Sequence, residues 1–265
     1  MSTDPVRILM LHGHGDCGQK FYHKTKGLCH SIRTEIHSQF QRDVEFVFPD
    51  APLASAPYNA DTRGWAHGDY RDEPLYFLEQ SIAFVLEILE KQGPFDGVIG
   101  FSAGALVGVI VATMLERLQF RHGYASEEEM FFKLPGQISH PPFRFIVAYS
   151  GFMLGNPIYR DLYPPVIHTP VMCFTGLLDP VVPGSLTMAL AKRCATSTVH
   201  SFWGTHYVPR TRSSYHLTSQ WVVSRLLGVE DGPIHGREMP LYQRGKGRTI
   251  EPGFDWFVNS SIFWE

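Results

Sequence analysis

The stretch from Asp96 to Ala112 constrains the fold of this chain more than any other. The apolar pair Val98 and Ile99 precedes Gly100-Phe101-Ser102-Ala103-Gly104, and a run of small and apolar residues, Ala105 to Met114, follows. The first run predicts the end of a buried strand and the second a buried helix. Glycines two positions before and after the serine permit a sharp turn, because side chains there would meet neighbouring backbone. We therefore expect Ser102 at the tip of a strand-to-helix turn.

Ser102 is the candidate nucleophile of the chain. In this strand–turn–helix context, G-x-S-x-G is the pattern of a nucleophile elbow. The N-terminus of the following helix would present backbone N–H groups and a favourable dipole to a developing oxyanion. A serine hydroxyl also needs a base within hydrogen-bond reach and a carboxylate that orients the base. We therefore expect an acid and a histidine further along the chain.

Asp179 and His206 fit these two roles. Asp179 lies in a Gly-x-x-Asp-Pro turn after a predicted strand, and His206 lies in a Gly-x-His turn after the next strand. The order nucleophile, acid, histidine is the one that accompanies a nucleophile elbow. His200 and His216 are rivals for the base, but we expect them within a strand and within a helix. Asp50 and Asp161 are weaker candidates for the acid.

Strands alternate with helices along the chain, which predicts an α/β fold with a mostly parallel central sheet and helices on both faces. In such sheets, ligands bind at the carboxyl ends of the strands, where the motifs above fall. Residues 51–74, rich in Pro, Ala, Asp and Tyr, predict a long irregular connection of the kind that builds binding sites. The expected strands are 6–11, 44–48, one ending at 98–99, 143–149, 170–175 and 197–202; the expected helices are 21–40, 75–89, 105–114, 185–193 and 213–227.

The loop after the first predicted strand has two interpretations. Gly13, Gly15 and Gly18 fit G-x-G-x-x-G, the fingerprint of dinucleotide binding, which would make the chain an NAD(P)-dependent oxidoreductase. Against this, Asp16 would bring a negative charge toward a pyrophosphate. In the alternative, His-Gly-His is the loop that supplies an oxyanion N–H, with the amide of His14 facing a substrate carbonyl.

Composition narrows the class of protein. With 265 residues, 44% of them apolar, we expect a single domain over 1–265. A net charge of −3 without a long run of one sign argues against a nucleic-acid or membrane-surface partner. There is neither a signal-peptide pattern nor an apolar run long enough to span a bilayer. Four scattered cysteines without metal spacing predict reduced thiols in a cytoplasmic protein, and we expect neither a metal nor a cofactor.

Several motifs in order give the chain a family resemblance. Residues 11–15, 63–65, 93–105, 149–152, 176–183 and 206–209 together resemble the fungal and animal FSH-type serine hydrolases, over about residues 5–228. The oxyanion loop is also similar to that of carboxylesterases and acyl-protein thioesterases. This resemblance implies the α/β-hydrolase fold and cleavage of an ester or thioester. Some fungal members release polyketide acyl chains from a carrier protein.

By this resemblance, Ser102, Asp179 and His206 are the nucleophile, acid and base, and the amides of His14 and Ala103 form the oxyanion hole. The chain departs from the family pattern in two places. The usual Gly-Gly-His turn reads Gly-Thr-His, and the usual Gln after the serine is Ala103. Neither change removes a catalytic group, because the expected donor at position 103 is a backbone N–H.

The expected reaction is hydrolysis of a small-molecule or carrier-bound acyl ester or thioester through an acyl-enzyme. An acyltransferase with the same triad and a catalytically silent binding module remain as alternatives, although a silent module normally lacks part of the triad. The oligomeric state and the acyl group stay open. Candidate walls of an apolar pocket are Trp65, Phe152, Met153 and Tyr207.

Two segments stand outside the family pattern. Residues 119–142 are charged and end in His-Pro-Pro, which predicts a surface insertion. Residues 229–265 form a C-terminal extension with an aromatic finish, and so much aromatic area predicts packing on the domain itself. A less favoured interpretation has the extension covering the pocket or a partner subunit.

Overall fold

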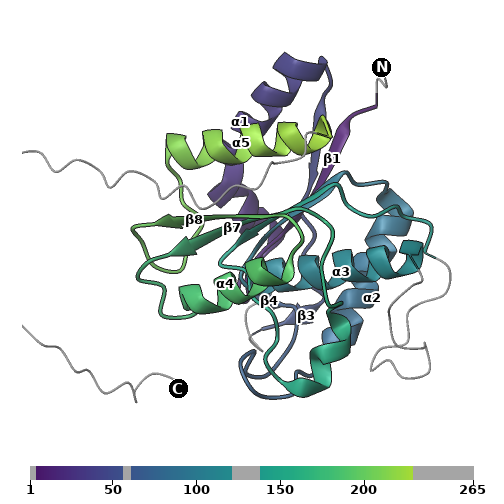
Figure 1. Cartoon of the computed structure of the whole chain (residues 1–265), viewed down its shortest axis with the longest axis vertical. Coiled ribbons are helices and arrows are strands. Elements are labelled where there is room, and N and C mark those ends of the chain that lie inside the picture. The colour runs from purple at the N-terminus through teal and green to yellow at the C-terminus, as the bar shows by residue number, and fades with distance from the viewer. Residues whose placement is uncertain (1–3, 56–60, 121–137, 229–265) are drawn as a thin grey trace, which may run out of the picture.

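The computed structural model describes residues 4–55, 61–120 and 138–228 (Figure 1). Their centre is a six-stranded sheet in which every neighbouring pair is parallel, with the strand order β2-β1-β5-β6-β7-β8. The sheet confirms the predicted α/β class and the parallel arrangement. Its strands are β1 (Val6–Leu11), β2 (Val44–Val47), β5 (Gly97–Phe101), β6 (Phe145–Tyr149), β7 (Val171–Gly176) and β8 (Ser197–Phe202).

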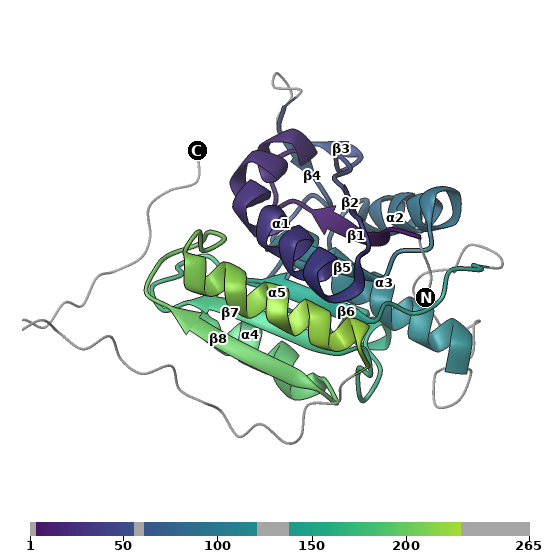
Figure 2. The ribbon, with the colours of Figure 1, turned by 90° about the horizontal axis from the view of Figure 1, so that it is seen from above.

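Helices cover both faces of this sheet (Figures 1 and 2). Helices α1 and α5 lie side by side on one face, and α2, α3 and α4 lie on the other (Figure 2). Because each central strand is buried on both faces, it reads as a continuous apolar run; every residue of β6 and β7 is buried. The helices are α1 (Gly18–Phe40), α2 (Leu78–Gln92), α3 (Ala103–Phe120), α4 (Gly184–Arg193) and α5 (Arg212–Leu226).

Helix α1 begins three residues before the predicted start at 21. Its first N–H, of Gly18, donates to the Asp50 carboxylate at 2.7 Å, so a distant side chain caps it. A negative charge at a helix start is stabilising, but Asp50 lies 32 residues from Gly18 and leaves no local pattern in the sequence.

Helix α2 begins three residues later than predicted, because Phe77 has left-handed backbone (φ 64°) and stands before the first helical turn.

The connection 51–74 is more regular than predicted. It contains a short antiparallel hairpin of β3 (Leu53–Ala54) and β4 (Arg63–Gly64). Backbone bridges also join Asp16 to Arg63 and His67 to Tyr76. The bridge between Asp16 and Arg63 fixes the connection against the loop after β1, so the connection is not a free loop.

One further element was not predicted, the 3₁₀ helix η2 (Pro157–Leu162) after β6. The hydroxyl of Tyr159 in η2 accepts a hydrogen bond from the Leu75 N–H, at 2.5 Å, which ties η2 to the start of the α2 region. The predicted insertion 119–142, apart from 119–120 and 138–142, and the whole extension 229–265 lie outside the described residues. Within the described ranges, no helix is long and apolar enough to cross a membrane.

Candidate active site

Ser102 lies between β5 and α3 in the predicted sharp turn. Its backbone is left-handed, with φ of 53°, which costs energy for a residue with a side chain and marks the tight turn of an elbow. A Cβ at Gly100 would lie 2.5 Å from the Ala105 Cα, and one at Gly104 would lie 2.3 Å from the carbonyl oxygens of Leu11 and His12. Both glycines are therefore required by close backbone approach.

The structure brings Ser102, His206 and Asp179 into one chain of hydrogen bonds. The His206 Nε2 lies 3.0 Å from the Ser102 Oγ, and the His206 Nδ1 lies 2.8 Å from the Asp179 Oδ2. With Nδ1–H donating to the carboxylate, Nε2 is left to accept the proton of the serine hydroxyl. This is the tautomer that a general base beside a serine requires.

The Asp179 carboxylate is fully buried and accepts four hydrogen bonds. Its Oδ1 accepts from the backbone N–H groups of Val181 and Val182, both at 2.9 Å. Its Oδ2 accepts from His206 and from the Ser150 hydroxyl, the latter at 2.9 Å. Four donors of this kind fix the orientation of a carboxylate. Ser150 was not predicted as a site residue, although it lies in residues 149–152, one of the motifs that carry the family resemblance.

The rival residues lie elsewhere. His200 lies within β8 with its ring against Phe174, at 5.3 Å between centroids, and His216 is exposed on α5. Asp50 caps α1, and Asp161 belongs to η2. Within the described parts of the chain, none of the four is hydrogen-bonded to Ser102 or His206.

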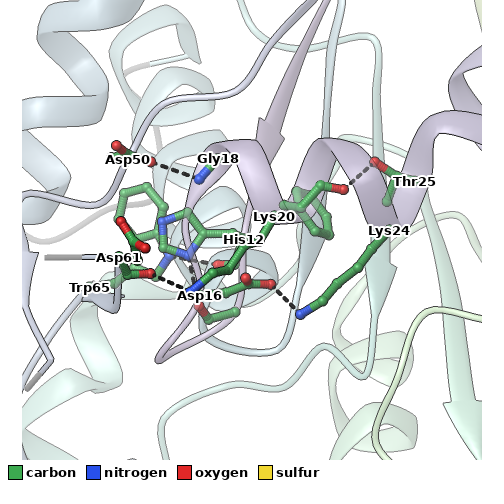
Figure 3. Close-up of polar contacts among 11 residues, drawn as sticks. His12, Asp16, Gly18, Lys20, Lys24, Thr25, Asp50, Asp61 and Trp65 are labelled. Atoms are coloured by element: carbon green, nitrogen blue, oxygen red, sulfur yellow. Dashed lines mark hydrogen bonds and ion pairs between the residues drawn. The ribbon is translucent and has the colours of Figure 1, made fainter. Parts of the chain in front are cut away.

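A buried network holds the loop after β1 (Figure 3). The His12 Nδ1–H donates to the Gly13 carbonyl at 2.7 Å, and its Nε2 accepts from the Ala51 N–H at 3.0 Å. The Trp65 indole N–H donates to the His12 carbonyl at 2.7 Å. Burial lowers the pKa of His12, which favours the neutral ring that both hydrogen bonds need. The loop is therefore fixed from two sides.

The same loop argues against dinucleotide binding at Gly13, Gly15 and Gly18. Asp50 occupies the N–H of Gly18 at the N-terminus of α1, where a pyrophosphate would have to bind (Figure 3). A Cβ at Gly18 would lie 2.2 Å from the Phe48 carbonyl oxygen, so this glycine serves close packing of α1 on the end of β2. Asp16 forms an ion pair with Lys24 at 2.7 Å. Two carboxylates at the helix start would repel a phosphate.

His14 and Ala103, whose amides are predicted to form the oxyanion hole, both line the pocket that contains Ser102. In the described parts of the chain, no acceptor is hydrogen-bonded to the N–H of either residue. The Ser102 N–H, by contrast, donates to the Tyr149 carbonyl at 2.9 Å. The amides of His14 and Ala103 are thus available as donors beside the serine.

The pKa of the His14 ring is lowered by burial and, to a smaller extent, by the nearby His67.

The pocket has a volume of about 870 Å³ and reaches Ser102 and His206. Phe152 and Met153 line it, as predicted for pocket walls. Two predicted walls need correction. Trp65 is completely buried, and its N–H donates to the His12 carbonyl. Tyr207 packs against Phe202 and is 42% exposed. Apolar lining also comes from Phe101, Val181, Val182 and Leu186, and polar lining from His14, His67, Asp69, Arg71 and Asp72.

A parallel sheet with helices on both faces and a serine on a strand-to-helix turn define an α/β hydrolase of the serine type. The chain belongs to the family described as Serine hydrolase (FSH1), whose profile matches residues 1–217. The chain is a serine hydrolase, and the match to this family confirms the resemblance inferred from the sequence. Among the described residues, no group of three or more His, Cys, Asp or Glu side chains is arranged to hold a metal ion.

Relatives with similar sequences include proteins named as serine hydrolases and esterases. Family of serine hydrolases 2 of Saccharomyces cerevisiae is 28% identical over 233 residues, which are 81% of this chain and 96% of that protein. Esterase CG5412 of Drosophila melanogaster is 29% identical over 224 residues, 79% of this chain and 70% of that protein. A Schizosaccharomyces pombe protein named dihydrofolate reductase is 26% identical over 227 residues, 78% of this chain, but the chain spans only 45% of that protein.

Solved structures show the same fold. The acyl-protein thioesterase 2 of Zea mays superposes with a TM-score of 0.55 and 18% sequence identity, over 85% of this chain and 95% of that one. At this identity the similarity establishes the α/β-hydrolase fold and no more.

Proposed function

We propose that the chain hydrolyses a carboxylic ester or thioester with Ser102 as nucleophile, His206 as general base and Asp179 as the orienting acid. One observation carries the proposal: the continuous hydrogen-bonded chain from Ser102 through His206 to the buried Asp179, at the edge of a pocket with apolar walls. The relatives named as esterases support an ester substrate.

The proposed reaction proceeds through an acyl-enzyme. The Ser102 Oγ attacks the substrate carbonyl while its proton passes to the His206 Nε2, and the carbonyl oxygen takes the negative charge. The amides of His14 and Ala103 stabilise that oxyanion. His206 then gives its proton to the departing alkoxide or thiolate. Water then attacks the acyl-enzyme while its proton passes to the His206 Nε2. His206 returns this proton to the Ser102 Oγ as the acyl–serine bond breaks, which releases the free acid and restores the serine hydroxyl.

The pocket favours an apolar acyl group. Phe152, Met153, Val182 and Leu186 supply apolar contact, and about 870 Å³ is ample room for an extended chain. We expect kcat/KM to rise with acyl length until the pocket is filled, because each buried methylene contributes about 0.8 kcal/mol.

Covalent labelling and substitution test the proposal. A fluorophosphonate should label the wild-type enzyme at Ser102, and Ser102→Ala should lower kcat by about 10⁴-fold or more without unfolding the protein. A panel of p-nitrophenyl esters and acyl thioesters of increasing length then reports the acyl preference. Retained activity in Ser102→Ala would contradict the assignment of the nucleophile. Product analysis with an alcohol or amine present separates hydrolysis from acyl transfer.

A further inference from the structure

Ser150 occupies the turn directly after β6, between the strands that lead to the serine and to the acid. In the sheet, β6 pairs with β5 on one side and with β7 on the other. The carbonyl of Tyr149 accepts from the Ser102 N–H at 2.9 Å, and the next side chain, Ser150, donates to Asp179 at 2.9 Å. Two consecutive residues thus hold the backbone of the nucleophile and the carboxylate of the acid.

The backbone at Ser150 is strained. Its φ is 47°, in the left-handed region that residues with a side chain seldom adopt, and its N–H donates to the Phe174 carbonyl at 2.8 Å. Glycine would adopt this conformation without penalty. A strained residue that carries a buried, hydrogen-bonded hydroxyl at an active site is a candidate for a functional role. The side chain is almost completely buried and meets Asp179 there.

We propose that Ser150 is a positioning residue, whose hydroxyl fixes the Asp179 carboxylate and limits how strongly that carboxylate stabilises protonated His206. This inference rests on the proposed function of the triad. The Asp179 Oδ2 accepts both from Ser150 and from His206, so the two donors share one oxygen. The hydroxyl draws negative charge from that oxygen and defines the direction from which the imidazole can approach.

Removal of the hydroxyl has two consequences with different readouts. The carboxylate loses one of four donors, so the His206 ring is held less firmly and kcat/KM should fall about 3- to 10-fold. The oxygen facing His206 also becomes more negative, which favours the imidazolium. Since protonated His206 cannot accept the serine proton, the acidic limb of the kcat/KM profile should move to higher pH, by about 0.3 to 1 unit.

The surroundings of His206 allow this shift to be attributed. In the described parts of the chain, its ring is hydrogen-bonded to Asp179 and Ser102, and the uncharged ring of Phe101 lies at 4.8 Å between centroids. The other ionisable groups that share the pocket stay unchanged in the variants; they are His14, His67, Asp69, Tyr70, Arg71 and Asp72.

Ser150→Ala and Ser150→Gly together test the proposal. Alanine removes only the hydroxyl, and glycine removes the hydroxyl and relieves the backbone strain. We expect both variants to lose kcat/KM similarly and to show the same shifted acidic limb, although Ser150→Gly should be the more stable to heat. A merely structural role predicts the opposite: activity would follow stability, and the acidic limb would not move.

Thr187→Val is the matched control. The Thr187 hydroxyl is also buried and donates at 2.9 Å to the carbonyl of Gly151, next to Ser150, but is not hydrogen-bonded to Asp179. It should lower stability and leave the acidic limb in place. If Ser150→Ala keeps the wild-type profile while Ser102→Ala is inactive, the positioning role is wrong and the triad stands. If Ser102→Ala remains active, the proposed function itself fails.

Discussion

The loops at the carboxyl ends of the strands fall into two halves of different character. The loops after β1 and β5 have a buried base. His12 is completely inaccessible, Gly104 touches backbone, and the inaccessible Trp65 packs beside them from the connection after β4, while His14 and Gly15 at the tip are exposed. The loops after β7 and β8 carry Asp179 and His206 but also expose large apolar side chains. Trp203 is 78% exposed, and Leu177 and Leu178 flank it through hydrogen bonds to the carbonyls of Phe202 and Gly204.

The difference in burial between the two sets of loops matches a difference in what each is expected to do at the site. Groups that must meet a developing charge work best when they are already in place before the reaction, and the first half carries the two amides that we propose for this task. In the exposed half, Asp179 is buried, but its apolar neighbours Leu177, Leu178 and Val181 face outward. Substitutions should therefore affect stability and catalysis strongly in the first half and weakly on the outer surface of the second.

A pair of tryptophans gives the largest expected contrast. Trp65→Ala should lower the free energy of unfolding by about 3–5 kcal/mol, because a completely buried indole leaves a cavity and the His12 carbonyl loses its donor. Trp203→Ala should change it by less than about 0.5 kcal/mol. Urea unfolding of both variants measures the difference, and equal losses would show that the two halves do not differ in packing.

A pair of glycines gives the next contrast. Gly104→Ala places a methyl group against the Leu11 and His12 carbonyls, which should cost about 1–3 kcal/mol and displace Ser102 enough to lower kcat about 10²-fold. Gly184→Ala is its control at the start of α4, where the nearest atom, the Thr175 Oγ1, lies at 3.3 Å. Stability measurements and single-turnover kinetics should find the control close to wild type.

Mild acid should produce the smallest effect. Burial lowers the pKa of His12 below the ordinary value of 6.5, so the unfolded chain binds protons at a pH where the folded chain does not. The contribution of His12 to stability is complete above about pH 6.5 and is lost as the pH falls below it. The unfolding free energy, measured at about 25 °C, should decline as the pH is lowered from about 7.5 to about 5.

His12→Asn should flatten that decline, whereas substitution of the exposed His30 on α1 should leave it unchanged. A slope that persists in His12→Asn would place its origin in other groups, among them the buried His140, whose pKa burial also lowers.

Much of the fold could be predicted because its signals are local. The apolar runs of β1, β6 and β7 and the periodic helices depend only on neighbouring residues. The positions of Ser102, Asp179 and His206 at strand ends followed from that reading, and the structure places the three side chains in contact. Their catalytic roles stay predictions until tested.

The parts that sequence reasoning missed depend on distant partners. Trp65 was predicted as a pocket wall, but its indole is drawn inward by the His12 carbonyl, 53 residues away. Ser150 meets Asp179 only because β6 and β7 pair in the sheet, 29 residues apart in sequence. The hairpin of β3 and β4 likewise depends on backbone pairing between Asp16 and Arg63. Such contacts have no local pattern.

The strand order has a consequence for the folding of the chain during its synthesis. Ser102 is delivered by β5, but its partner His206 follows β8, 104 residues later and at the far edge of the sheet. During synthesis Ser102 therefore leaves the ribosome long before His206, and contacts so distant in sequence form slowly. Until the last strand docks, the Ser102 hydroxyl has no histidine beside it. Under the proposed triad, completion of the sheet is the step that makes the hydrolase active.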